Sequence, residues 1–166
     1  MVTFTSNSPE ETQALGETLG RAARPGLVLG LSGELGTGKT QLVKGLARGL
    51  GISARVQSPT FVLVNIYPGG RLSLFHLDLY RLETPSEILA AGLEEYLQPD
   101  GVTVIEWVER WFGTAGPAGE DPKAAGHGMP ADTSLSLGVE PSRFRREWFE
   151  AVSETQRCIR YEDIGA

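Results

Sequence analysis

The residues best suited to do chemistry lie together at 33–41, where the sequence reads GELGTGKTQ. This stretch completes the pattern G-x-x-x-x-G-K-[ST] of a phosphate-binding loop through Gly33, Gly38, Lys39 and Thr40. Glycines let backbone N–H groups approach phosphate oxygens, and a helix that begins at such a loop adds a favourable dipole. The stretch therefore predicts a site for a nucleoside triphosphate.

Two side chains of this loop have specific predicted roles. Lys39 is expected to place its ammonium between the β- and γ-phosphates, and Thr40 is expected to offer its hydroxyl to Mg²⁺. The predicted phosphate contacts are Gly33, Glu34, Leu35, Gly36, Thr37, Gly38, Lys39, Thr40 and Gln41.

Two acidic residues are candidates for the metal side of the site. Glu106 ends an apolar run, as the acid beside magnesium does in the second motif of a P-loop ATPase. Period-two alternation places His76, Asp78 and Tyr80 on one face of a strand. Asp78 is therefore a second candidate for contact with the metal or its waters, whereas we interpret His76 as a structural histidine.

A further candidate is Thr60, which lies in the segment Ser58-Pro59-Thr60-Phe61. The segment follows the helix after the loop, where nucleotide switches often supply a Thr to the metal or the γ-phosphate. A plain loop with a buried Phe61 explains the same residues equally well. We assign the tryptophans Trp107, Trp111 and Trp148 to packing or a partner surface.

The elements that must position these residues follow from periodicity and capping. A buried strand at 27–32, the glycine loop and a helix from Thr40 to Gly51 supply the context that the loop motif requires. Capping boxes predict helices over about 9–23 and 85–97, the second weakened by Gly92. Strands at 60–67 and 71–80 flank a Pro-Gly-Gly turn, and 101–107 is a buried strand. The predicted fold is α/β: a P-loop NTPase-like three-layer sandwich whose mixed sheet contains an inserted antiparallel hairpin.

The last third of the chain is less regular. Residues 113–131 are mostly Gly, Ala and Pro, which predicts a flexible loop. We expect a strand near 133–139, a helix over 141–153 that uses Phe144, Trp148 and Val152, and a strand at 156–162. Residues 1–166 are predicted to form a single P-loop ATPase domain with an atypical C-terminal tail.

Composition restricts the classes of function. The chain has 166 residues, the size of one domain, and a formal net charge of -6. Proteins that bind nucleic acid directly usually carry a basic face, so direct binding of RNA or DNA is not expected. The lone Cys158 suits a reducing cytosol. The apolar runs are shorter than the roughly 20 residues that cross a bilayer, and no signal peptide is visible, so we expect a cytoplasmic protein without a membrane partner.

The stretches GELGTGKT, SPTF, HLDLYR, GLEEYL and VIEW, in this order, resemble the bacterial TsaE (YjeE) family over residues 8–111. The resemblance implies a Mg-dependent P-loop ATPase that is slow alone and is stimulated by its partners TsaD and TsaB. These proteins together make the threonylcarbamoyl modification on the adenosine beside the tRNA anticodon. The partners perform the transfer, so tRNA is reached only through the complex.

The family's residues map onto this chain position by position. Its phosphate loop falls on residues 33–40, its metal-side acid on Glu106, its switch threonine on Thr60 and its strand aspartate on Asp78. This gives Lys39, Glu106, Asp78 and Thr60 as catalytic residues, and Thr40, Glu106 and Asp78 as ligands of Mg²⁺. Many members have a second Thr where this chain has Gln41, whose amide can still bind a phosphate oxygen. Arg157 matches a basic residue of the last family strand, near the nucleotide.

Other classes of protein share parts of this pattern. A small-molecule phosphotransferase would need a mobile lid with arginines, but residues 113–131 contain none. A GTP-driven switch normally carries an Asn-Lys-x-Asp guanine reader, which is absent, so ATP is the expected nucleotide. In a protein with a purely structural role, the occurrence of Lys39 in the loop motif and of Glu106 at a strand end would be a coincidence.

Overall fold

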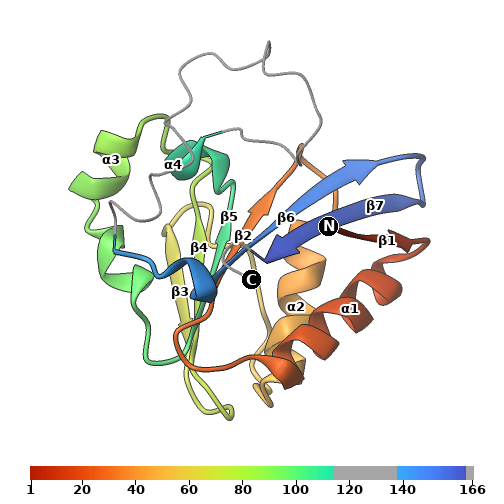
Figure 1. Ribbon diagram of the computed structural model, residues 1–166, viewed down its shortest axis with the longest axis horizontal. Coiled ribbons are helices and arrows are strands. Elements are labelled where there is room, and N and C mark those ends of the chain that lie inside the picture. The colour runs from red at the N-terminus through yellow and green to blue at the C-terminus, as the bar shows by residue number, and fades with distance from the viewer. Residues whose placement is uncertain (114–137, 164–166) are drawn as a thin grey trace.

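The computed structural model describes residues 1–113 and 138–163. Within these residues, seven strands form one mixed sheet in the order β1-β7-β6-β2-β5-β4-β3 (Figure 1). The pairs β2–β5, β2–β6 and β4–β5 are parallel, and the other three are antiparallel. The strands are β1 (Val2–Ser6), β2 (Val28–Ser32), β3 (Val64–Tyr67), β4 (Leu74–Asp78), β5 (Val102–Glu106), β6 (Phe144–Ala151) and β7 (Arg157–Asp163).

Helices cover both faces of this sheet. α1 (Pro9–Ala22) and α2 (Lys39–Gly49) lie on one face, over a core that includes Leu42, Leu46 and Val104 (Figure 1). α3 (Pro85–Ala90), the 3-10 helix η1 (Leu93–Leu97) and α4 (Glu109–Phe112) lie on the other, over a core that includes Ile88, Trp111 and Ile105. A short 3-10 helix, η3 (Pro141–Arg143), leads into β6. The predicted three-layer α/β sandwich is confirmed.

Glycines let α1 and α2 approach each other closely. A Cβ added to Gly16 would lie 2.1 Å from the carbonyl oxygen of Leu42, and one added to Gly45 would lie 1.9 Å from that of Gln13. Gly20 and Gly49 make equally close approaches. Because no larger residue fits at these four positions without moving a backbone, the glycines set the spacing of the two helices.

Local signals in the first two thirds of the chain are confirmed. Ser8 caps α1 by accepting a hydrogen bond from the Glu11 amide at 3.1 Å, and Thr84 caps α3 in the same way. β3 and β4 form the expected antiparallel hairpin, although β3 is shorter than the predicted strand. The predicted helix over 85–97 divides at Gly92, whose φ of 74° breaks the helical path before η1.

The prediction of a helix over 141–153 is wrong, because Phe144–Ala151 form strand β6 between β2 and β7. The spacing of Phe144, Trp148 and Val152 explains the error: steps of four place residues on one face of a helix and equally on one face of a strand. Pairing with two neighbouring strands decides the outcome. The sequence interpretation also missed β1, which pairs with β7 at an edge of the sheet.

Several sequence predictions lie outside the described residues. These are the flexible loop at 113–131, apart from Gly113, and the strand near 133–139, apart from Gly138 and Val139, which are not in a strand. None of the described helices is long and apolar enough to span a bilayer.

Candidate nucleotide and metal site

The phosphate loop connects the end of β2 to the start of α2, as its motif requires. Gly38 precedes α2 with a φ of 99°, a left-handed conformation that favours glycine. No side chain caps the first turn of α2. Its backbone N–H groups are therefore free to bind an anion, and the helix dipole favours negative charge at the same place.

Lys39 is held inside the loop that precedes it. Its Nζ donates to the carbonyl oxygens of Gly33 at 2.5 Å and Glu34 at 2.9 Å. The same nitrogen lies 4.1 Å from the centre of the Trp107 ring. Burial lowers the pKa of the Lys39 ammonium, and the nearby carboxylates of Glu106 and others oppose that shift. The ammonium is thus desolvated and held at the loop. There it can exchange its carbonyl acceptors for a phosphate oxygen.

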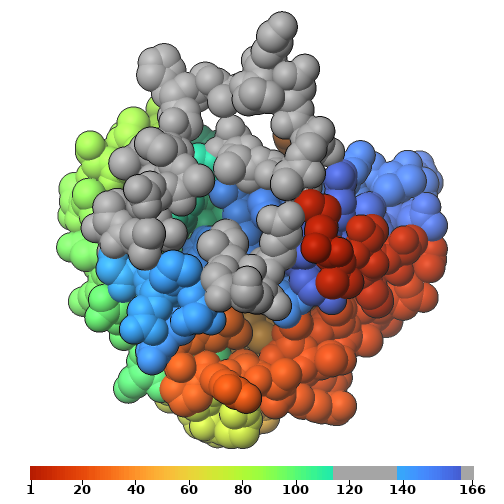
Figure 2. All heavy atoms as spheres, viewed as in Figure 1, coloured from red at the N-terminus to blue at the C-terminus, as the bar shows by residue number. Residues whose placement is uncertain are grey.

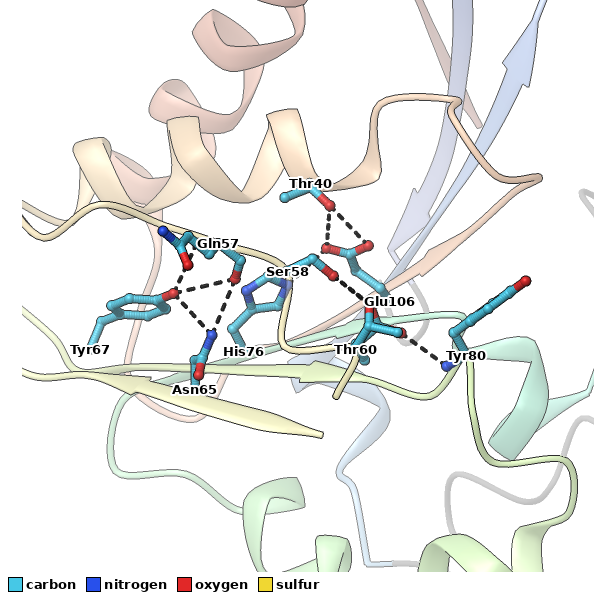
Figure 3. Close-up of polar contacts among 10 residues, drawn as sticks. Thr40, Gln57, Ser58, Thr60, Asn65, Tyr67, His76, Tyr80 and Glu106 are labelled. Atoms are coloured by element: carbon cyan, nitrogen blue, oxygen red, sulfur yellow. Dashed lines mark hydrogen bonds and ion pairs between the residues drawn. The ribbon is translucent and has the colours of Figure 1, made fainter. Parts of the chain in front are cut away.

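Glu106 lies at the end of β5, next to the beginning of α2 (Figure 3). The Thr40 hydroxyl is 2.9 Å from Glu106 Oε1 and 3.2 Å from Oε2. Glu106 is 3% exposed, so its charge is removed from water and depends on these donors. The contact brings two of the proposed magnesium ligands together.

Asp78 ends β4 and is the register partner of Glu106 in the parallel pair β4–β5. Its Oδ2 accepts hydrogen bonds from Ser58 at 2.8 Å and Thr60 at 2.9 Å, while its Oδ1 accepts one from the Tyr80 amide. The predicted switch segment is therefore attached to the sheet through one buried carboxylate. Phe61 is not buried as the plain-loop interpretation supposed, since it is 79% exposed.

His76 is the main residue whose placement the sequence interpretation undervalued. It is fully buried in β4, and its Nε2 lies 2.8 Å from Glu106 Oε1. The sequence did contain a signal that His76 lies near the site, because period-two alternation puts it on the same face of the strand as Asp78. That face lies toward α2. Only the parallel pairing of β4 with β5 brings Glu106 to that face as well.

Lys39, Thr40, Asp78 and Glu106 line one cavity of about 820 Å³, whereas His76 is buried and is not part of its lining. Of the predicted site residues, the lining includes Leu35, Gly36, Gly38, Lys39, Thr40, Gln41, Thr60, Asp78 and Glu106, together with Ser58. Gly33, Glu34 and Thr37 do not line the cavity but shape the loop behind it. Thr37 Oγ1 donates to the Glu34 carbonyl at 2.8 Å, and Gln41 Oε1 accepts from Gln13 of α1.

Another part of the cavity lining was not expected from sequence, apart from Arg157. It is formed by Asn7, Pro9 and Thr12 near the start of α1, and by Glu154, Thr155 and Arg157 near the β6–β7 turn. In the space-filling view the start of the chain lies against the end of the described chain, where β1 pairs with β7 (Figure 2). Trp107 also differs from its sequence interpretation, because it lines the cavity rather than only packing; Trp111 is buried as expected.

The donor atoms fit magnesium. The Thr40 hydroxyl and the carboxylates of Glu106 and Asp78 are hard oxygen donors, and Mg²⁺ usually takes one or two carboxylates and completes its shell with phosphate and water. In the described part of the chain, no group of three or more His, Cys, Asp or Glu side chains is arranged to hold a metal ion.

Comparison with known proteins agrees with this geometry. Residues 6–124 match the model of the family described as threonylcarbamoyl adenosine biosynthesis protein TsaE. The chain belongs to the TsaE family. It is 28% identical to the crystal structure of Bacillus subtilis YdiB, with a TM-score of 0.70, over 99% of this chain and 86% of that one.

Three curated relatives are named tRNA threonylcarbamoyladenosine biosynthesis protein TsaE. The chain is 49% identical to that of Bacillus subtilis over 60% of its own length and 62% of the relative. It is 50% identical to that of Nostoc sp. strain PCC 7120 over 61% and 64%, and 46% identical to that of Treponema pallidum over 63% and 77%. The match thus spans less than two thirds of the first two TsaE proteins.

Proposed function

We propose that this protein binds ATP with Mg²⁺ in the cavity and hydrolyses it as the TsaE component of a system that makes threonylcarbamoyladenosine in tRNA. The observation that carries the proposal is the meeting of a complete phosphate loop with two buried carboxylates at one end of an 820 Å³ cavity. Membership of the TsaE family supports the assignment to threonylcarbamoyladenosine biosynthesis.

Binding of the triphosphate rests on the loop wall of the cavity. The uncapped N–H groups of α2 can donate to the phosphate oxygens, and Lys39 can exchange its two carbonyl acceptors for phosphate. The cavity continues past the phosphates to Asn7, Pro9 and Thr155, so the nucleoside has room between the start of α1 and the β6–β7 turn.

Thr40, Glu106 and Asp78 would hold the metal. Bound Mg²⁺ supplies charge that offsets the developing charge on the transferred phosphoryl group. Glu106 is already hydrogen-bonded and buried, so it needs little reorganisation to act on the metal side or on the attacking water. Thr60 shares the carboxylate of Asp78 with Ser58, and it can leave that bond to meet the γ-phosphate.

Partners complete the site in this proposal. Arg157 is the arginine in the cavity lining; its Nη1 donates to the Ser153 carbonyl at 2.8 Å and its Nη2 to the Gly36 carbonyl of the phosphate loop at 3.4 Å. Its guanidinium is therefore already engaged by backbone carbonyls, and an isolated protein should be a slow ATPase. We propose that TsaD and TsaB supply the missing stimulation. The net charge of -6 suits a protein that reaches tRNA through them.

The test is a reconstitution. Purified TsaD and TsaB, their substrates, ATP, Mg²⁺ and unmodified tRNA are mixed with and without this protein, and modified adenosine is counted per TsaD over time. Repeated turnover should require the wild-type protein and should fail with Lys39→Ala. Equal turnover in its absence would reject the proposed role in this pathway, and a small-molecule phosphotransferase would become the better interpretation.

A further inference from the structure

His76 lies in the interior of the sheet, on the strand that carries Asp78 and beside the strand that carries Glu106. It has no exposed surface, and its Nε2 is 2.8 Å from Glu106 Oε1 (Figure 3). Burying a polar ring at this place is costly unless the ring is hydrogen-bonded. The contact with Glu106 therefore needs a physical account.

The chemistry of the two groups determines which of them donates. An ionised carboxylate only accepts hydrogen bonds, so the proton of the contact belongs to Nε2 of His76. A neutral imidazole has one N–H, which leaves Nδ1 without a proton. Nδ1 is buried and has no hydrogen-bond partner among the described residues, as an unprotonated nitrogen can tolerate better than a buried N–H could.

The contact restricts a side chain that is otherwise long and flexible. A glutamate has one more rotatable bond than an aspartate, and more freedom is lost when it is fixed. Oε1 of Glu106 accepts from both His76 and Thr40, whereas Oε2 receives only the longer 3.2 Å contact from Thr40. His76 thus holds one oxygen and leaves the other with the weaker contact to Thr40.

We propose that His76 is a positioning residue: its ring donates from Nε2 to Glu106 and fixes that carboxylate for contact with the metal or the attacking water. The inference rests on the proposed function, in which Glu106 acts on the metal or the attacking water. It does not require His76 to touch nucleotide or metal. Partners that orient a metal-side ligand typically contribute ten- to a hundredfold to metal affinity or activity.

The first experiment separates orientation from packing. His76→Leu removes the donor, and His76→Gln restores an amide donor with similar reach. Calorimetry measures ATP binding without Mg²⁺ and over a Mg²⁺ titration, with melting temperature and steady-state hydrolysis alongside. His76→Leu should need ~10-fold or more Mg²⁺ for half-maximal enhancement and lose ~10-fold or more in turnover. Its Mg-free ATP affinity should stay within about twofold of wild type, and His76→Gln should recover most of both losses.

A matched control addresses stability. Leu74→Ala changes a fully buried apolar residue on the same face of β4, two residues before His76, and removes no donor. It should lower the melting temperature yet leave the Mg²⁺ dependence as in wild type. If it shifts that dependence as much as His76→Leu, or if His76→Leu matches wild type, the positioning role is overturned. Wild-type protein without Mg-dependent ATP binding would instead overturn the proposed function itself.

A second measurement needs neither nucleotide nor a variant of His76. The chain has two histidines, so His127→Gln leaves one imidazole for assignment by ¹H–¹⁵N NMR. Nε2 of the ring should carry a proton, and Glu106→Gln should perturb the signals of the ring. A proton on Nδ1 in place of Nε2 would contradict the proposal even if every His76 variant failed to fold.

Discussion

The cavity has two walls that are built in different ways. The loop wall is the segment 33–41 and the start of α2, and its internal contacts are local: Lys39 to Gly33, six residues earlier, and Thr37 to Glu34, three earlier. The opposite wall joins distant parts of the chain. Ser58 meets Asp78 across 20 residues and His76 meets Glu106 across 30, while Glu106 meets Thr40 of the loop wall across 66.

This difference indicates a division of labour. A wall made of consecutive residues needs only a strand and a helix to support it, and it presents donors to phosphate before any partner arrives. The assembled wall depends on the register of β4 against β5 and on the attachment of the Ser58 segment to one carboxylate. We infer that the loop wall governs ATP affinity and that the assembled wall governs turnover.

The largest expected effect tests the loop wall. Lys39→Ala removes a buried cation that we propose to bind the phosphates, and losing one partner of a buried charge pair costs enough to weaken ATP binding by ~1000-fold. The melting temperature should change little, because the carbonyls of Gly33 and Glu34 can bind water instead. Calorimetry measures the affinity, and a wild-type value for Lys39→Ala would reject this site.

The assembled wall should respond differently to Glu106→Gln. A group that acts mainly in the transition state lowers turnover more than ground-state binding. We expect hydrolysis with partners present to fall at least ~100-fold, while ATP affinity stays within a fewfold of wild type. Glu94→Gln, an exposed carboxylate, controls for the change in charge. Hydrolysis within about twofold of wild type would contradict the division of labour.

The same contrast explains what the sequence could predict. The loop, the capped helices and the hairpin follow from residues that are close in the chain, and the structure confirms them. Lys39 and Thr40 were found by a contiguous motif. Asp78 and Glu106 were found because each ends an apolar or alternating run, which marks the carboxyl end of a strand, and the resemblance to a family agreed.

Other features depend on pairing that no local pattern contains. The sequence of β6 predicted a helix because its spacing of apolar residues in steps of four fits both a helix and a strand. β1 was missed because its strand is stabilised by pairing with β7, which lies far away in the sequence. The contact of His76 with Glu106 depends on the pairing of β4 with β5, which brings together residues 30 positions apart in the chain. Trp107 follows a strand end like any packing residue, and its φ of 61° turns the chain where the ring lines the cavity.

A smaller effect is expected from the switch segment. Thr60→Ala removes one donor to Asp78 and the hydroxyl proposed for the γ-phosphate, but Ser58 still binds the same carboxylate. Stimulation of hydrolysis by TsaD and TsaB should fall by ~10-fold, the scale of one lost hydrogen bond to a charged group. ATP affinity should fall less, and Thr60→Ser should restore stimulation. Equal losses of affinity and stimulation would place Thr60 in ground-state binding instead.

The smallest effect on nucleotide handling is expected where α1 packs on α2. In an exposed helix, Gly→Ala stabilises by about 1 kcal/mol, but a Cβ at Gly45 would lie 1.9 Å from the Gln13 carbonyl oxygen. Overpacking of this kind typically costs about 1–3 kcal/mol, so Gly45→Ala should lower the melting temperature. Thr18→Ala, on the exposed side of α1, should leave it nearly unchanged.

ATP affinity is the informative measurement on Gly45→Ala, taken well below its melting temperature. The hydrogen bonds of Lys39 and Thr37 are internal to residues 33–39, so shifting α1 by about an ångström should leave them in place, and the flexible side chains of Gln13 and Gln41 can adjust where α1 touches the loop wall. We expect the affinity to stay within about twofold of wild type despite the lost stability. A loss comparable to that of Lys39→Ala would show that α1 supports the loop directly. The loop wall would then be assembled from distant segments, like the wall opposite.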